Sequence, residues 1–315
     1  MQATSAPKRG IETFFFTLIV LAILRVVLAS ATVPITILPI ANIVMGCLFL
    51  GGPLLALCFA ARDPWSRKMG FTFFVGGLTL QISCFVLSSY VFQHADIPAQ
   101  VINALGQVGL PIWCVGLGAL LATLIKDQNI VVPIAIFLAC LDMFLVFSPL
   151  GLTRMIIKSV PSMLPAIAVQ IPIASHQTTG EKISPGALAG PADFLFLAMF
   201  LIAIFRFNMQ GRKTVLVVIP TLLAYMMLVS LVHTPLPALV PIGTVVLLVN
   251  WKEFRLSKDE VISTGVVGGL GLALFTWGMF QKPTVVQVDS APRETIPMPA
   301  KSPSSLPPTS TNQLK

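Results

Sequence analysis

Nine long apolar runs, separated by short polar segments, constrain this chain more than any other feature of its sequence. They lie at 12–31, 40–61, 69–92, 103–125, 129–149, 188–206, 213–233, 235–250 and 261–280. A helix needs about 20 mostly apolar residues to cross the hydrocarbon core of a bilayer, where backbone polar groups must be paired internally. The sequence therefore predicts an all-α polytopic membrane protein with about nine transmembrane helices, embedded in a lipid bilayer.

The composition excludes several other classes of protein. Only 10% of the 315 residues are charged and 56% are hydrophobic, whereas soluble proteins carry about 25% charged residues. The net charge of +8 comes from basic residues at the ends of the apolar runs, without a basic stripe interleaved with aromatics, so we expect no nucleic-acid partner. The five cysteines form no CxxC pair and have no histidine at ligand spacing, so we expect neither a metal site nor a cofactor.

Lys and Arg residues are divided unequally between the two sets of connections. With a cytoplasmic N-terminus, twelve lie on the cytoplasmic side and three on the other, leaving aside Arg25 within the first run and the C-terminal tail. Because cytoplasmic loops carry the excess of basic residues, this pattern predicts that the N-terminus is cytoplasmic. The short length and the lack of large soluble insertions indicate a prokaryotic cytoplasmic membrane.

Two of the twelve acidic residues lie inside apolar runs. Asp142 falls in LACLDMFLVF and Asp193 in GPADFLFLAMF. A central aspartate costs about 2.5–3.5 kcal/mol on insertion scales, so it is rarely kept without a use. One such residue can be a protonated carboxyl that hydrogen-bonds to a neighbouring helix, but two on adjacent runs favour a functional pair.

A pair of adjacent carboxyl groups has a specific chemistry. Like charges a few ångströms apart do not both ionise cheaply, so the two groups share one proton. The ionised carboxylate can then deprotonate a water, while the protonated partner polarises a peptide carbonyl. The same two aspartates could instead relay protons in a proton-coupled transporter or channel, and the pattern alone leaves both interpretations open.

Three short motifs occur in order around these aspartates. They are Leu141-Asp142, then Gly190-Pro191-Ala192-Asp193, then Pro237-Ala238-Leu239 within PLPALVPIG. The chain here resembles the presenilin and signal peptide peptidase family of intramembrane aspartyl proteases, which carries Tyr-Asp, Gly-x-Gly-Asp and Pro-Ala-Leu motifs in this order. LDMFLVFSPLGLTRMIIKSV and DFLFLAMF are also similar to the runs that follow the family's two aspartates.

The resemblance implies an aspartic endopeptidase that cleaves single-span membrane proteins or signal peptides. It implies a catalytic dyad of Asp142 and Asp193, with Gly190, Pro191, Ala192, Pro237, Ala238 and Leu239 positioning the substrate. Leu141 stands where the family has tyrosine, and Ala192 where it has glycine. These departures leave a further alternative, a catalytically inactive homologue that binds transmembrane helices without cutting them.

The expected organisation follows from the runs and the motifs. N-terminal helices occupy 1–128, a presenilin-like catalytic core 129–250, an additional helix 251–281, and a disordered Pro/Ser/Thr-rich tail 282–315. The long connection 150–187 within the core contains MLPAIAVQIPIA, which could be a substrate-pairing strand or an amphipathic surface segment.

Two further features of the runs lead to expectations about packing. Arg25 could pair with a carboxylate or snorkel to the membrane interface. Gly265 and Gly269 form a GxxxG motif that predicts helix packing, within the chain or between copies.

Overall fold

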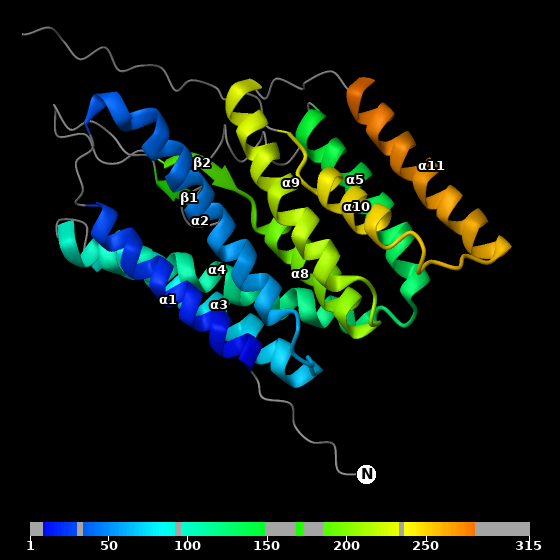
Figure 1. The fold of residues 1–315 in the computed structure, drawn as a ribbon, viewed down its shortest axis with the longest axis horizontal. Coiled ribbons are helices and arrows are strands. Elements are labelled where there is room, and N and C mark those ends of the chain that lie inside the picture. The colour runs from blue at the N-terminus through cyan, green and yellow to red at the C-terminus, as the bar shows by residue number, and fades with distance from the viewer. Residues whose placement is uncertain are drawn as a thin grey trace, which may run out of the picture. The chain divides into compact units, whose positions relative to one another are not determined.

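The computed structural model describes residues 9–29, 34–91, 96–148, 168–172, 185–232 and 236–280. Most of the connection 150–187 and all of the predicted tail 282–315 lie outside the described residues. The helices are α1 (Arg9–Ala29), α2 (Leu38–Ala60), α3 (Arg67–Val86), α4 (Asp96–Leu124), α5 (Val131–Phe147), α8 (Pro191–Arg206), α9 (Gly211–Val232), α10 (Leu239–Val249) and α11 (Lys258–Phe280). Figure 1 shows these helices as a bundle of alternating direction.

Short elements complete the described fold. Single turns of 3-10 helix, η1 (Ile35–Ile37) and η3 (Gln128–Ile130), precede α2 and α5, and one π-helical turn, η2 (Leu87–Val91), continues α3. Strand β1 (Val169–Pro172) pairs antiparallel with β2 (Pro185–Ala189), with Val169 opposite Ala189 and Gln170 opposite Leu188. The register shifts between Ile171 and Pro172.

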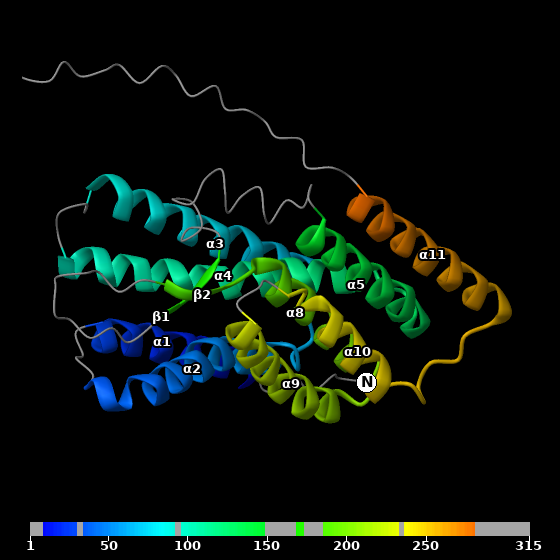
Figure 2. The ribbon, with the colours of Figure 1, turned by 90° about the horizontal axis from the view of Figure 1, so that it is seen from above.

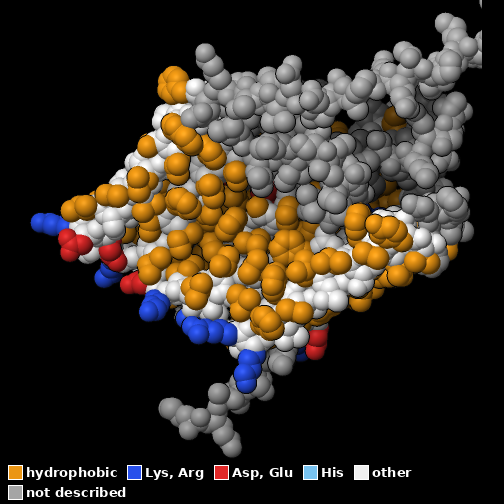
Figure 3. All heavy atoms as spheres, turned by 180° about the vertical axis from the view of Figure 1, so that it is seen from behind, with side chains coloured by type: hydrophobic (Ala, Val, Ile, Leu, Met, Phe, Trp, Pro, Cys, Tyr) orange, Lys and Arg blue, Asp and Glu red, His pale blue; other side chains and the backbone are white. Residues whose placement is uncertain are grey.

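The described helices have the lengths and surfaces of a membrane protein. Seven are long and apolar enough to cross a membrane by length and composition, whereas α8 and α10 are shorter. Large apolar side chains are exposed on the outer helices, among them Phe16, Phe71, Leu216 and Leu270. Contiguous apolar surface of this kind is rare on soluble proteins, and Figure 3 shows it covering much of one face. The chain is an all-α polytopic membrane protein.

Basic residues gather at one end of the bundle. Every described Lys and Arg except Arg25 lies in a connection or in a terminal turn at this basic end: Arg9, Arg62, Arg67, Lys68, Lys126, Arg206, Arg212, Lys213, Lys252, Arg255 and Lys258. In Figure 3 the charged side chains follow one edge of the apolar surface. The charge asymmetry read from the sequence therefore corresponds to a physical end of the bundle.

Hydrogen bonds between connections hold the helix ends together at the basic end. Arg206 Nη1 donates to the carbonyls of Ala122 and Ile125, at 2.8 and 3.2 Å, and so ties the end of α8 to the end of α4. Gln210 N donates to Asn250 Oδ1 at 3.0 Å, which joins the α8–α9 turn to the end of α10. These bonds fix α8 and α10 in depth relative to α4.

Helix α8 is the central helix of the bundle. Ten of its residues, from Phe194 to Ile204, are buried, and it packs against α2, α4, α9 and α10. Its packing on α4 is close, because a Cβ added at Gly118 would lie 2.8 Å from the Leu195 carbonyl oxygen. Figure 2 shows α8 enclosed by neighbouring helices. A helix buried on all sides can be short and still be held firmly.

Candidate functional site

Asp142 lies on the inward side of α5, about two thirds of the way along it. The residue is half-buried, and its Oδ2 accepts a hydrogen bond from the backbone N–H of Leu239 at 2.8 Å. Leu239 is the first residue of α10, where backbone N–H groups have no partner within the helix. The aspartate therefore satisfies a free donor at the start of α10, 97 residues away along the chain.

Asp193 lies in the first turn of α8. Gly190 is the N-cap with φ −68° and ψ 148°, and Pro191 opens the helix. Proline suits this position because its fixed φ is helical and its missing N–H would have no helical partner. The backbone N–H of Gly190 donates to the Asp193 carboxylate, which is the reciprocal half of a capping box.

The start of α8 differs from the sequence prediction. The apolar run at 188–206 predicts a helix from its first residue, but residues up to Ala189 belong to strand β2 and the helix begins at Pro191. A residue that precedes proline favours extended backbone. This preference keeps Gly190 out of the helix, which therefore begins at Pro191. Asp193 is consequently near the end of a helix and not in its middle.

The two aspartates come together in the fold. Their carboxyl groups lie close enough to interact electrostatically. Measured from the basic end, Asp142 lies 11 residues along α5, Asp193 13 residues along α8 and Leu239 10 residues along α10. At 1.5 Å per residue these positions are about 17, 20 and 15 Å from the basic end of their own helices.

The third motif forms the turn that enters α10. Leu236 and Pro237 are not helical, and Ala238 is the N-cap of α10 with φ −79° and ψ −21°. Pro237 is buried and Ala238 half-buried. The run at 235–250 predicts a longer helix, but the prolines delay its start to Leu239. Leu236 and Pro237 therefore enter the site as non-helical backbone.

Tyr225 is the site residue that motif reasoning missed. It lies on α9, and its hydroxyl donates to the carbonyl oxygen of Pro237 at 2.8 Å. It also interacts electrostatically with both Asp142 and Asp193. A signal for it exists in the sequence, since Tyr225 is one of only two tyrosines and lies within an apolar run, where its hydroxyl needs a partner.

The remaining predicted residues take up less direct positions. The carbonyl of Pro191 accepts a bond from the buried thiol of Cys114 at 3.4 Å, which attaches the start of α8 to α4. Ala192 is exposed and adds no polar group. Gly190 has an ordinary extended backbone, and a Cβ added there would meet Asp193 Oδ2 at 3.5 Å, an ordinary contact. Neither backbone strain nor crowding among the described residues requires glycine at 190.

Strand β2 leads directly into the site, and β1 is held by side chains of α1 and α4. Gln107 Nε2 donates to the Ala168 carbonyl at 3.4 Å, and Gln107 Oε1 accepts from Gln170 N at 3.0 Å. Arg25 donates to the carbonyl of Gln170, and its guanidinium lies 5.3 Å from the centre of the Phe49 ring. Among the described residues Arg25 thus binds a strand carbonyl, not a carboxylate.

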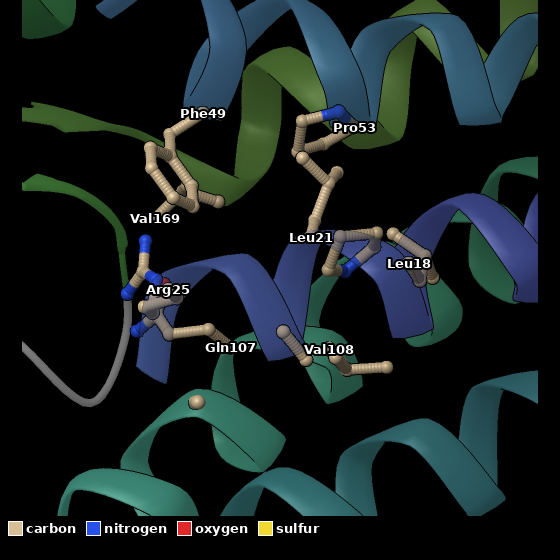
Figure 4. A pocket seen from close by; sticks show the side chains of 11 residues that line it. Leu18, Leu21, Arg25, Phe49, Pro53, Gln107, Val108 and Val169 are labelled. Atoms are coloured by element: carbon tan, nitrogen blue, oxygen red, sulfur yellow. The ribbon is translucent and has the colours of Figure 1, made fainter. Parts of the chain in front are cut away.

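A small pocket of about 30 Å³ lies beside this attachment (Figure 4). Its lining comes from α1, α2, α4 and β1, and Figure 4 shows Arg25 near Phe49 and Val169. None of the residues around Asp142 and Asp193 lines it. The pocket therefore belongs to the attachment of β1 and not to the aspartate pair.

Within the described part of the chain, no group of three or more His, Cys, Asp or Glu side chains is arranged to hold a metal ion. The chemistry open to the described site is that of two carboxyl groups, one phenol, the Cys114 thiol and backbone amides. No family model, curated protein or solved structure matches the chain.

Proposed function

We propose that this chain is an intramembrane aspartyl protease that hydrolyses peptide bonds of single-span membrane proteins or signal peptides. The observation that carries the proposal is the convergence of Asp142, Asp193 and the turn at 237–239. These segments are far apart in the sequence, yet a hydrogen bond from Leu239 N to Asp142 Oδ2 and the interaction between the carboxyl groups bring them together. A resemblance in three separate motifs is thus supported by their meeting in space.

The proposed chemistry divides two roles between the aspartates. One carboxylate takes a proton from a water, which attacks the carbonyl carbon of the scissile peptide bond. The other carboxyl, protonated, donates a hydrogen bond to the carbonyl oxygen and a proton passes to the leaving nitrogen as the C–N bond breaks. Both aspartates lie at a helix N-terminus, where the aligned peptide dipoles favour the single negative charge that the pair shares.

The hairpin beside the site fits an extended substrate. A helical substrate hides its carbonyls in internal hydrogen bonds, so cleavage requires an unwound segment with other partners. Strand β2, which pairs with β1, ends immediately before Gly190, and a strand edge can add a further strand by main-chain bonding. We infer that substrate binds in extended form next to β2.

The charge asymmetry of the bundle supports an orientation. If the basic end faces the cytoplasm, the N-terminus is cytoplasmic, α5 runs outward and α8 returns. Substrates with a cytoplasmic N-terminus are then favoured, as in signal peptide peptidase, which the chain resembles more than presenilin in this respect. We propose a prokaryotic cytoplasmic membrane as the location.

Cleavage of a tagged single-span substrate by purified protein tests the proposal. Asp142→Asn and Asp193→Asn keep the size of each side chain but remove its ability to exchange a proton, and we expect each to abolish fragment formation. Asp259→Asn is the matched control, because Asp259 is exposed in the first turn of α11, and it should cleave like wild type.

A transition-state inhibitor of aspartyl proteases separates this function from proton relay. A peptide-hydrolysing pair should bind it, and a transporter that uses the same aspartates should not. Absence of cleavage across a varied substrate panel, together with absence of inhibitor binding, would remove the proposed function. Inhibitor or substrate binding without cleavage would instead indicate an inactive homologue.

A further inference from the structure

The phenol of Tyr225 is linked to Asp142 through three residues of backbone. Its hydroxyl donates to the Pro237 carbonyl at 2.8 Å, and two residues later the Leu239 N–H donates to Asp142 Oδ2 at 2.8 Å. The phenol thus contacts the first residue of the 237–239 turn, and the aspartate contacts the last. This connection joins α9, α10 and α5 at the level of the aspartates.

Among the described residues, the start of the turn is non-helical backbone. Leu236 and Pro237 lie outside any helix, so no regular helical hydrogen bonds fix them. Pro237 has no backbone N–H to donate. The direction in which Leu239 N–H points depends on the orientation of this turn, and Tyr225 holds the carbonyl at its start.

We propose that Tyr225 is a positioning residue of the aspartate site, which holds the 237–239 turn so that the Leu239 amide stays directed at Asp142. The expected effect of Tyr225 on turnover rests on the proposed protease function. The hydroxyl acts through the turn and not on the scissile bond. Its proximity to both aspartates places it where loss of the hydroxyl disturbs the pair and little else.

Tyr225→Phe is the direct test, because it removes only the hydroxyl that bonds to the Pro237 carbonyl and keeps the ring. Displacement of a catalytic group by about an ångström costs on the order of a hundredfold in rate. We therefore expect kcat to fall roughly tenfold to a hundredfold, while KM for the substrate stays within about a factor of two, because the proposed substrate contacts near β2 are untouched.

Tyr90→Phe is the matched control. Tyr90 is the only other tyrosine, and it is 80% exposed in the π-helical turn after α3. Tyr90→Phe removes the same hydroxyl from an exposed position that is not part of the aspartate site, so kcat should be unchanged. The two variants should also unfold at the same temperature in detergent, within a few degrees, which separates positioning from a general loss of fold.

Hydrogen–deuterium exchange tests this tether, the hydrogen bond by which Tyr225 holds the 237–239 turn, without any reaction. Exchange at the amides of 236–240 should be faster in Tyr225→Phe than in wild type, and unchanged in Tyr90→Phe. If wild type cleaves and Tyr225→Phe retains full kcat, the positioning role is wrong. If wild type cleaves nothing, the proposed function is lost, and exchange then decides the tether alone: unaltered exchange at 236–240 overturns it.

Discussion

Asp142 and Asp193 each lie against the first turn of a helix, although only one of them belongs to the helix concerned. Asp193 is in the first turn of α8 and accepts from Gly190 N–H, whereas Asp142 belongs to α5 and accepts from the first residue of α10. A helix N-terminus offers unpaired N–H groups and a positive dipole. Both positions offset part of the free-energy cost of a carboxylate in an apolar environment.

Gly118 sets how close α8 comes to α4, and its substitution makes the first residue-scale prediction. A Cβ there would lie 2.8 Å from the Leu195 carbonyl oxygen and 2.9 Å from Ala198 Cβ, so Gly118→Ala must push the two helices apart. Overpacking of this kind costs about 1–3 kcal/mol. We expect a lower unfolding temperature in detergent, and reduced cleavage because Asp193 moves with α8.

Gly76→Ala is the control for this substitution. Gly76 is exposed on α3 with nothing within 4 Å of an added Cβ, and alanine is favoured over glycine inside a helix by about 0.5–1 kcal/mol. Its unfolding temperature should equal or exceed that of wild type. Equal stability for the two variants would mean that α4 and α8 do not approach as closely as described.

At the residue scale, the sequence predicts the carboxyl groups better than their partners. Asp142 and Asp193 could be selected because an aspartate in an apolar run is costly. The donor to Asp142 could not, since a backbone N–H exists at nearly every position and only the fold decides which one is free. Tyr225 was missed because no motif links α9 to the turn at 237–239.

Among the elements, the β1–β2 hairpin depends on neighbouring helices for its position. Two strands alone are marginally stable, but β1 is bonded on both sides of Val169 by the side-chain amide of Gln107, to Ala168 O and from Gln170 N. Arg25 of α1 adds a bond to the Gln170 carbonyl. The hairpin that leads into Asp193 is thus anchored to the first and fourth helices.

Gln107→Leu tests this anchoring. The substitution keeps a similar volume and removes two hydrogen bonds to β1, each contributing about 0.5–1.5 kcal/mol. We expect exchange at residues 169–171 to accelerate roughly tenfold, since each 1.4 kcal/mol of local opening free energy is a factor of ten. If substrate pairs next to β2, KM should rise while kcat changes little.

Gln100→Leu provides the comparison on the same helix. Gln100 is exposed on α4, seven residues before Gln107. Its substitution makes the same change of side chain away from the hairpin. It should leave exchange at 169–171 as in wild type. Equal exchange in Gln107→Leu and wild type would contradict the anchoring role of Gln107.

Element positions could be predicted from apolar runs, but element ends could not always be. Each of the nine runs overlaps one described helix, because the requirement for internal backbone pairing in lipid leaves little choice. The starts of α8 and α10 were misplaced, where prolines and strand pairing compete with the helix. The GxxxG motif does not mark packing within the described chain, because nothing lies within 4 Å of a Cβ added at Gly265 or Gly269, and α11 instead packs through Gly271 and Gly278. Packing between copies through this motif stays a prediction.

For the whole bundle, helix direction places all described basic residues except Arg25 at one end. Asp142 and Asp193 lie nearer the other end. The pair lies about 17–20 Å from the basic end of its helices, within a hydrocarbon core of about 30 Å. Water must therefore reach the site from within the bundle or from the end opposite the basic residues. Both aspartates are partly exposed as whole residues, which is compatible with such access.

Reporter fusions at successive connections test this arrangement in a membrane. If the basic end is cytoplasmic, green fluorescent protein fused after Lys126, Asn208 or Ser257 should fluoresce, and alkaline phosphatase fused after Ser148, Val232 or Phe280 should be active. The fusions after Ser148, Asn208 and Val232 are decisive for the site, because they ask whether the short helix α8 passes across the membrane between α5 and α9. Phosphatase activity after Asn208 would mean that α8 does not cross, and Asp193 would then lie outside the depth of Asp142. Activity after Lys126 with fluorescence after Phe280 would invert the whole bundle, and with it the direction of the proposed substrate.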